Sequence, residues 1–373
     1  MDSTNTDGTV TRRGFLGGAA AAAAGAYAFS PGLGSHAAAQ QVTKVNSTIN
    51  GVRLGINAPY SFRGQYASAE ETLKAMVQLG LSWVELRGPA IEGYAGMPQA
   101  PAAAAGGGGA RGGGGGGGGG GGEGPAAGAA GGAAGARPAP AQRTPEQIAA
   151  QQATARQRAE EIKRWRLSQS MDKYHDLRRM YEQAGVNIQL VKFPDLTADL
   201  SDDEADYIFQ VAKALGAEAI TTEPPLSHTK RLGQIANKHR IMIGYHGHDQ
   251  VTEVERFGRP GAFEQAFFYS PYNGANVDIG HWTAGNNTSA EPFIREYAHR
   301  ITNLHLKDRK KDHGPNVAWG EGDTPLVPIL RMMRDMKYTF QATIELEHPV
   351  PAGSDVLKEI AKCVEFARRA LNS

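Results

Sequence analysis

The sequence has few of the features that mark several common classes of protein. Cysteine occurs once among 373 residues, at Cys363, so no intramolecular disulfide can form even in a compartment that would permit one. Cys363 falls in a helical pattern near the C-terminus, where we expect it to pack as a small apolar residue. The fold must therefore be held by core packing and not by disulfides.

An excess of charge of one sign is also missing. Lysine and arginine number 39 and aspartate and glutamate 38, a balance that favours neither nucleic acid nor an acidic partner. No basic stretch is interleaved with aromatic residues, so we expect no nucleic-acid partner. The predicted strand that contains Gly55 lacks a GxGxxG turn, and the glycine-only run lies in an insertion after the second predicted strand, so neither a dinucleotide site nor a phosphate-binding loop is supported.

Long apolar runs are rare, and the clearest one lies near the N-terminus. The segment TRRGFL at residues 11–16 precedes GGAAAAAAGAYAF and the small-residue stretch SHAAAQQ. This arrangement resembles a twin-arginine export signal over residues 1–40, with cleavage near Ala39. The apolar part is too short and too rich in alanine for an ordinary membrane span. We therefore expect the twin-arginine export machinery as a partner and a periplasmic or exported location.

A second segment is set apart by its composition. Residues 96–143 are almost entirely alanine, glycine and proline, and such a segment cannot bury enough apolar surface to offset its ordering entropy. We expect a disordered insertion there. A charged helical pattern begins directly after it, with Thr144 as the N-cap and Pro145 in the first turn.

The remaining chain alternates between predicted strands and helices. Short apolar runs predict eight strands, at residues 52–59, 82–88, 187–195, 218–225, 240–248, 274–281, 301–308 and 341–348. Helical periodicity predicts helices between them, at residues 68–80, 173–185, 201–216, 229–239, 291–300 and 324–337. Eight strands with intervening helices favour a single (β/α)8 barrel domain over residues 50–373, with the insertion after its second strand.

Polar side chains gather at one end of nearly every predicted strand. In such a barrel the chemistry takes place at the carboxyl ends of the strands. Reading these ends in order gives Asn57, Glu85, Arg87, Lys192, Asp195, Glu223, His246, His248, Asp278, His281, His305, Lys307, Asp308, Glu345, Glu347 and His348. Five of the 11 histidines lie at the ends of four consecutive strands. Buried carboxylates that face one another need hydrogen-bonded pairing or a cation.

The motif HGH at residues 246–248 has two interpretations. On an extended strand His246 and His248 point to the same side, and Gly247 leaves room above the backbone between them. The pair is either a hydrogen-bonded end of a strand or part of a metal or substrate site, because neutral imidazole is a common metal ligand.

Four motifs, VDIGHWTAGN, NLHLKDR, WGEGD and IELEH, resemble those of the xylose isomerase-like barrels, often called sugar phosphate isomerases/epimerases. The resemblance runs from about Val52 to Ala370 outside the insertion. It implies a divalent metal held by a glutamate, an aspartate, a histidine and a glutamate on the fifth to eighth strands. The last three positions fall on Asp278, His305 and Glu345, and the first falls on His246.

At the fifth-strand position, where the resembled family carries a metal-binding glutamate, this chain has His246. A carboxylate from the neighbouring fourth strand could take its place. Glu223 at its end could supply the missing carboxylate, so the expected ligand set is Glu223, Asp278, His305 and Glu345, with His246 as a fifth. A mixed shell of carboxylate and imidazole suits Mn²⁺, Mg²⁺, Co²⁺ or Zn²⁺.

The resemblance also implies roles in catalysis and substrate binding. Glu345 is expected to act as one general base, and Glu223 or His246 as the other. The expected substrate contacts are His248, His281, Lys307 and Lys192.

The function implied is a metal-dependent sugar isomerase or epimerase that removes a proton next to a carbonyl. Because phosphorylated sugars are mainly cytosolic, an exported member is expected to act on a free sugar or keto-sugar. Two alternatives stay open: a lyase or dehydratase acting on inososes or 3-keto-glycosides, and a sugar-binding barrel without turnover. A nuclease of the endonuclease IV type is disfavoured by the charge balance. A homo-oligomer stays open, because relatives often pair through the barrel.

Overall fold

A computed structural model describes residues 44–99 and 144–373 of the chain, all within the compact unit Val42–Ser373. The predicted export signal at residues 1–40 lies outside the described residues. Nearly all of the predicted disordered insertion lies outside them too, and of its range only residues 96–99 are described. Both remain predictions from the sequence.

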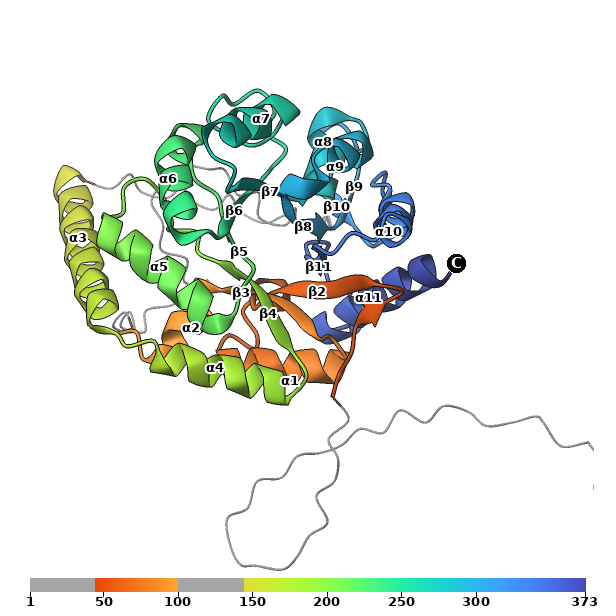
Figure 1. The fold of residues 1–373 in the computed structure, drawn as a ribbon. Helices are drawn as coiled ribbons and strands as arrows, with labels where there is room; N and C mark the ends of the chain where they lie inside the picture. The colour runs from red at the N-terminus through yellow and green to blue at the C-terminus, as the bar shows by residue number, and fades with distance from the viewer. Residues whose placement is uncertain (1–43, 100–143) are drawn as a thin grey trace, which may run out of the picture. The chain divides into compact units, whose positions relative to one another are not determined.

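Eight parallel strands form a closed barrel, as the sequence predicts (Figure 1). They are β2 (Val52–Ala58), β3 (Trp83–Arg87), β4 (Asn187–Lys192), β5 (Ala219–Thr222), β6 (Met242–His246), β7 (Asn273–Asp278), β8 (Ile301–Leu306) and β11 (Gln341–Ile344). The ring closes because β2 pairs with β3 on one side and with β11 on the other. Short antiparallel pairs are added by β1 (Thr48–Ile49) beside β2, and by β9 (Asp308–Arg309) with β10 (Asn316–Val317).

Helices surround the strands on the outside of the barrel (Figure 1). They are α1 (Ala69–Leu79), α2 (Gly88–Ala95), α3 (Pro145–Ser168), α4 (Asp172–Gln183), α5 (Asp202–Leu215), α6 (Thr229–His239), α7 (Pro260–Tyr269), α8 (Ile279–Asn286), α9 (Glu291–Glu296), α10 (Leu326–Asp335) and α11 (Val356–Asn372). Three 3₁₀ turns, η1 (Tyr60–Phe62), η2 (Leu226–His228) and η3 (Ala298–Arg300), complete the described secondary structure. Within the described ranges, no helix combines the length and apolarity needed to cross a bilayer.

Local sequence signals explain where several helices begin and end. Ser68 and Ser201 form capping boxes at the starts of α1 and α5, and each helix ends at a glycine with positive φ. Thr144 caps α3 through the amide of Gln147, and Pro145 occupies its first turn, as predicted. Polar caps therefore fix the starts of α1, α3 and α5, and glycine residues fix the ends of α1 and α5.

Every predicted strand extends beyond the carboxyl end of the observed one, and two of these differences are informative. The strand predicted at residues 274–281 ends at Asp278, because the Asp278 Oδ1 atom accepts a hydrogen bond from the His281 amide at 2.8 Å and starts α8. His281 is therefore on a helix and not on a strand. The strand predicted at residues 341–348 likewise ends at Ile344, so Glu345 and Glu347 project from the loop that follows.

The apolar core lies between the strands and the helices, whereas the inside of the barrel is polar at its carboxyl end. Asn57 on β2 donates to Glu345 at the end of the neighbouring β11, and Glu85 on β3 reaches across the interior to His305 on β8. All four residues are buried. This polar interior holds the candidate site.

A buried ion-pair cluster ties α3 to the rest of the barrel. The Arg166 Nε atom lies 2.7 Å from Glu92 Oε1 on α2, and its Nη2 atom lies 2.5 Å from Asp195 Oδ2, which follows β4. Arg166 and Glu92 are both buried. The cluster anchors α3, whose other residues are largely exposed.

Candidate active site at the carboxyl end of the barrel

Four buried side chains converge at the ends of four neighbouring strands. His246 ends β6, Asp278 ends β7, His305 lies on β8 and Glu345 follows β11. Each offers one nitrogen or oxygen atom, and these atoms all lie within 4.8 Å of one another. Parallel strands bring their carboxyl ends to the same edge, and the register sets Asp278 directly beside His305.

The imidazole of His305 lies between carboxylates on both of its edges. Its Nδ1 atom is 3.1 Å from Glu345 Oε2 and 3.9 Å from Asp278 Oδ2, and its Nε2 atom is 2.5 Å from Glu85 Oε2. Burial by itself would lower the pKa of His305, but the charges of Glu345 and Glu85 and their hydrogen bonds raise it to about 9.

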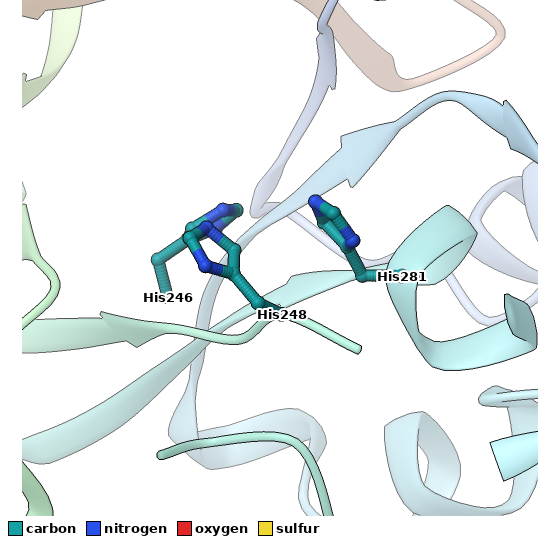
Figure 2. A group of neighbouring side chains, drawn as sticks. All are labelled: His246, His248 and His281. Atoms are coloured by element: carbon teal, nitrogen blue, oxygen red, sulfur yellow. The ribbon is translucent and has the colours of Figure 1, made fainter. Parts of the chain in front are cut away.

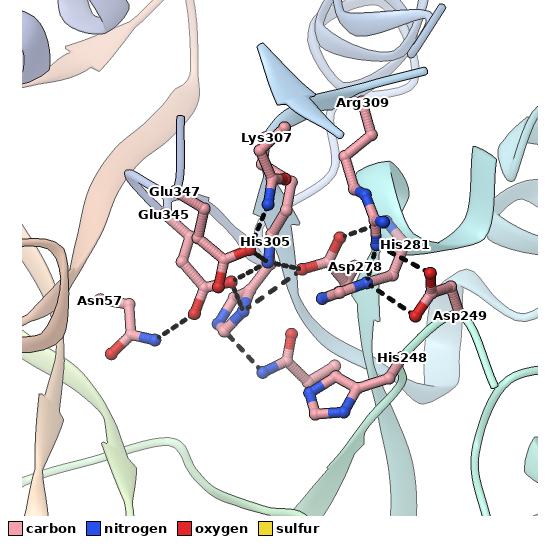
Figure 3. A network of polar contacts seen from close by, with 12 residues as sticks. Asn57, His248, Asp249, Asp278, His281, His305, Lys307, Arg309, Glu345 and Glu347 are labelled. Carbon is pink, nitrogen blue, oxygen red and sulfur yellow. Dashed lines mark hydrogen bonds and ion pairs between the residues drawn. The ribbon is translucent and has the colours of Figure 1, made fainter. Parts of the chain in front are cut away.

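A buried lysine joins three carboxylates of the site (Figure 3). The Lys307 Nζ atom lies 2.9 Å from Asp278 Oδ2, 2.7 Å from Glu345 Oε2 and 2.7 Å from Glu347 Oε2. Burial disfavours the ammonium, yet these anions raise the pKa of Lys307 well above its ordinary value. Burial likewise disfavours the Glu345 carboxylate, but His305 and Lys307 hold the pKa of Glu345 well below its usual range. Both groups are therefore charged at neutral pH.

The donor set of this cluster fits a divalent metal. The buried atoms His246 Nδ1 and Asp278 Oδ2 accept or donate no hydrogen bond within the described ranges, although Lys307 lies at ion-pair distance from the latter. Burial, together with the charge of Lys192, lowers the pKa of His246 well below its usual value, so its imidazole is neutral and keeps a free lone pair. Two imidazoles and two carboxylates are ligands that Mn²⁺, Co²⁺ and Zn²⁺ accept.

The structure does not place Glu223 among these four donors. Its Oε1 atom lies 2.5 Å from the Nζ atom of the buried Lys192, and its Oε2 atom lies 3.7 Å from His248 Nε2. Burial would raise the pKa of Glu223, but the charges of Lys192 and His248 lower it to about 2. Glu223 follows β5, which is four strands from β11 in either direction around the ring, so it faces Glu345 across the barrel mouth.

Three histidines form a second group that shares His246 (Figure 2). His246, His248 and His281 each offer a nitrogen within 4.8 Å of the others. The ring centroids of His248 lie 4.8 Å from those of both His246 and His281. Burial, followed by the charge of His281, lowers the pKa of His248 to about 4. His248 therefore presents a neutral imidazole at the rim of the site.

His281 is held from the outside by a charged pair. The Arg309 Nη1 atom donates to His281 Nδ1 at 2.6 Å and also lies 3.1 Å from Asp249 Oδ2. The close approach of His281, whose Nδ1 atom is 3.6 Å from Asp249 Oδ1, and the charge of Arg309 lower the pKa of Asp249 below its ordinary value despite burial. These contacts, drawn in Figure 3, fix the orientation of the His281 ring beside His248.

Sequence reasoning gave no role to several residues of this network. Glu85 contacts His305, Asn57 donates to Glu345 Oε1 at 2.8 Å, and Asp249 and Arg309 hold His281. The sequence signal for Glu85 is its position near the carboxyl end of the predicted strand at residues 82–88. Its partner could not be read from the sequence because the two residues are 220 positions apart.

A larger hollow lies away from this cluster. It measures about 490 Å³ and is lined by Ser82, Trp83 and Asn187, near the amino ends of β3 and β4. A much smaller pocket is lined by Glu223, His246 and His248 at the carboxyl end. The charged and imidazole groups converge at the carboxyl end, which is therefore the candidate site.

Comparisons with known proteins show what this architecture resembles. No family model and no curated protein matches the chain. Among solved structures, a xylose isomerase domain protein from Alicyclobacillus acidocaldarius is similar with a TM-score of 0.51 at 11% identity, covering 86% of this chain and 99% of the other. A sugar phosphate isomerase/epimerase from Parabacteroides distasonis has a TM-score of 0.50 at 13% identity, covering 87% and 96%.

A third similar structure has a different described activity. It is the probable 3-DHS dehydratase AsbF of Bacillus anthracis, involved in petrobactin synthesis, with a TM-score of 0.51 at 11% identity over 84% of this chain and 99% of the other. At these identities the similarity shows the fold alone. The chain thus has the (β/α)8 barrel fold of the xylose isomerase-like and sugar phosphate isomerase/epimerase structures.

Proposed function

We propose that the protein is a divalent-metal-dependent sugar isomerase or epimerase. The observation that carries the proposal is the convergence of His246, Asp278, His305 and Glu345, whose donor atoms lie within 4.8 Å of one another in a buried site. The same fold in sugar isomerase/epimerase structures supports an enzyme of this class.

A divalent ion bound by these four residues would polarise the carbonyl and neighbouring hydroxyl of a sugar and stabilise the enediolate that proton removal leaves. The chain itself supplies groups that hold and move the proton. Glu345 stays ionised between His305 and Lys307, so it can accept a proton from a bound sugar. Glu223, kept ionised by Lys192, is the second base.

The positions of the two bases determine the stereochemistry that the site can support. Because β5 and β11 lie opposite each other in the ring, a sugar bound between them has Glu223 on one face and Glu345 on the other. Removal of a proton on one face and its return on the other inverts a carbon, and return to the neighbouring carbon isomerises the sugar. In this proposal His248, His281 and Lys192 hold substrate oxygens.

We infer the substrate class from the expected location of the protein. The twin-arginine segment supports export to the periplasm, where unphosphorylated sugars and keto-sugars are the available carbohydrates. The site fits this substrate class, because its lysines already pair with carboxylates. Lys192 pairs with Glu223, and Lys307 pairs with Asp278, Glu345 and Glu347.

A lyase or dehydratase is the second candidate. Elimination begins with the same proton abstraction but needs a further group to protonate the leaving oxygen. His248, 3.7 Å from Glu223 Oε2, supplies a second group that can carry a proton beside that base. The similarity in fold to a probable dehydratase supports the same candidate.

Two measurements on the purified full chain test these proposals. Metal analysis after incubation with Mn²⁺, Co²⁺ or Zn²⁺ should find about one equivalent bound, with thermal stability lost in chelator. Incubation with free sugars and 3-keto-sugars in D₂O should then place deuterium on the carbon next to the carbonyl. Deuterium without loss of water or bond cleavage supports the isomerase, and an unsaturated product or a released aglycone supports the lyase. If the protein binds sugar but no deuterium is incorporated, the result supports a sugar-binding barrel without turnover.

A further inference from the structure

A buried carboxylate from the opposite side of the barrel contacts His305. Glu85 on β3 is fully buried, and its Oε2 atom lies 2.5 Å from His305 Nε2 on β8. The two strands are not neighbours in the ring, so Glu85 reaches His305 across the barrel interior. This contact lies on the side of the imidazole that faces away from Glu345 and Asp278.

The orientation of Glu85 is itself fixed by its neighbours. The Thr221 hydroxyl on β5 donates to Glu85 Oε1 through a short hydrogen bond, and the Asn276 Nδ2 atom on β7 lies 3.4 Å from the same oxygen. With Oε1 engaged by both groups, Oε2 is left for His305. Side chains from two other strands, β5 and β7, therefore hold the Glu85 carboxylate against the Nε2 edge of His305.

This arrangement determines which nitrogen of His305 can bind an ion. The Asn276 Nδ2 atom also lies 3.1 Å from His305 Nε2, but the Glu85 carboxylate is closer, at 2.5 Å, and can only accept a hydrogen bond, so Nε2 carries the proton in this contact. The lone pair of a neutral His305 is then on Nδ1, which faces Glu345 Oε2 at 3.1 Å and Asp278 Oδ2 at 3.9 Å. Imidazole ligands of metals commonly donate their other N–H to such a carboxylate, which fixes the ring and raises its basicity.

We propose that Glu85 is the positioning residue for His305, holding its Nε2–H so that Nδ1 is presented to a divalent metal. The inference rests on the proposed metal site and adds a residue that does not itself touch the ion. A purely structural role would only require that the buried charge be paired. Glu92 serves as the matched control for Glu85. It is also a buried carboxylate and forms an ion pair with Arg166, but it lies away from the site.

The experiment compares metal affinity in four variants of the full chain with that of the wild type. Mn²⁺ and Co²⁺ dissociation constants are measured by equilibrium dialysis, and the unfolding free energy of each metal-free variant is measured in parallel. Glu85→Gln should weaken metal binding roughly 10- to 100-fold. Thr221→Val, which removes the hydroxyl that orients Glu85, should weaken it about threefold to tenfold, and Thr221→Ser should restore binding close to wild type. Glu92→Gln should lower stability and leave metal affinity unchanged.

The outcomes separate this inference from the proposed function. If the wild type binds neither ion, the metal-dependent function fails and the inference fails with it. If the wild type binds metal but Glu85→Gln and Thr221→Val bind within about twofold of it, the positioning role alone is overturned. Equal weakening by Thr221→Ser and Thr221→Val would also overturn it, because the hydroxyl would then be irrelevant. Should Glu85→Gln fail to fold, the comparison of the two Thr221 variants still decides.

Discussion

The Nζ atom of Lys307 lies 2.9 Å from Oδ2 of Asp278, inside the cluster that fits a divalent metal. The same ammonium is 2.7 Å from Glu345 Oε2. Lys307 therefore shares both acidic donors of the cluster with any ion that binds there. The charge of this lysine, and not only the presence of carboxylates, sets how strongly the site attracts a cation.

Removing the charge of Lys307 should tighten metal binding. In Lys307→Met the ammonium no longer neutralises Asp278 and Glu345, so we expect the dissociation constant for Mn²⁺ to fall about tenfold or more. The metal-free variant should be less stable by about 3–5 kcal/mol, because buried carboxylates lose their partner. Calorimetric titration and chemical denaturation measure the two effects. Lys310→Met, which changes an exposed lysine paired with Asp323 at 3.9 Å, is the control. Weaker metal binding in Lys307→Met would contradict the prediction.

Metal uptake should release a proton from His305. The pKa of His305 is raised to about 9, so at neutral pH its imidazole is protonated and Nδ1 must lose its proton before it can bind an ion. The apparent affinity should therefore rise about tenfold per pH unit between about pH 6 and 8 and level off near the pKa. Titration in buffers of different ionisation enthalpy counts the protons released. An affinity that does not change over this range would show that His305 is not a ligand.

Glu223 and Asp278 should respond differently to loss of charge. Asp278→Asn removes a donor of the buried cluster, so the bound metal should fall well below one equivalent. Glu223→Gln should keep its metal, because Glu223 is bound to Lys192 and lies outside the four donors, but turnover should fall about 10²- to 10⁴-fold with loss of a general base. Metal analysis and initial rates on the same preparations distinguish the two variants. Loss of metal in Glu223→Gln would instead place Glu223 among the ligands.

The Lys192–Glu223 ion pair should make the free energy of unfolding depend on pH in the acidic range. The pKa of Glu223 falls from an ordinary 4.5 to about 2 in the folded protein, so the folded state binds its proton more weakly than the unfolded state does. Its contribution to stability is complete above pH 4.5 and is lost as the pH falls toward 2. Glu223→Gln should flatten the fall of unfolding free energy in this window. Glu218→Gln is the control. Glu218 is 59% exposed in its ion pair, so this variant should leave the pH dependence of the unfolding free energy unchanged.

Arg166 should be important for stability and not for the site. Arg166→Met leaves Glu92 as an unpaired buried carboxylate, so we expect a loss of about 3–5 kcal/mol of unfolding free energy. Faster proteolytic cleavage within α3 should accompany it, while metal content stays unchanged. Arg179→Met breaks an ion pair in which Arg179 is 62% exposed and should cost less than about 1 kcal/mol. A drop in metal affinity in Arg166→Met would show that the α3 anchor and the site are coupled.

Several structural features could be predicted from the sequence because they depend on local order. Apolar runs separated by helical periodicity predicted all eight barrel strands, and Thr144 with Pro145 predicted the start of α3. The rule that parallel strands present their carboxyl ends at one edge predicted that Asp278, His305 and Glu345 would lie together. Each of these predictions rests on the spacing of neighbouring residues or on the topology of the barrel.

The sequence by itself therefore determined the barrel and the set of polar groups at its mouth. Only the tertiary structure decided how those groups pair: Glu85 with His305 across the interior, Lys307 with Asp278, and Glu223 with Lys192 instead of with the four donors. It also decided that His281 belongs to a helix capped by Asp278. The physical reason is that ion pairs and hydrogen bonds depend on distances of about 3 Å between groups far apart in the chain, and only closure of the ring sets those distances.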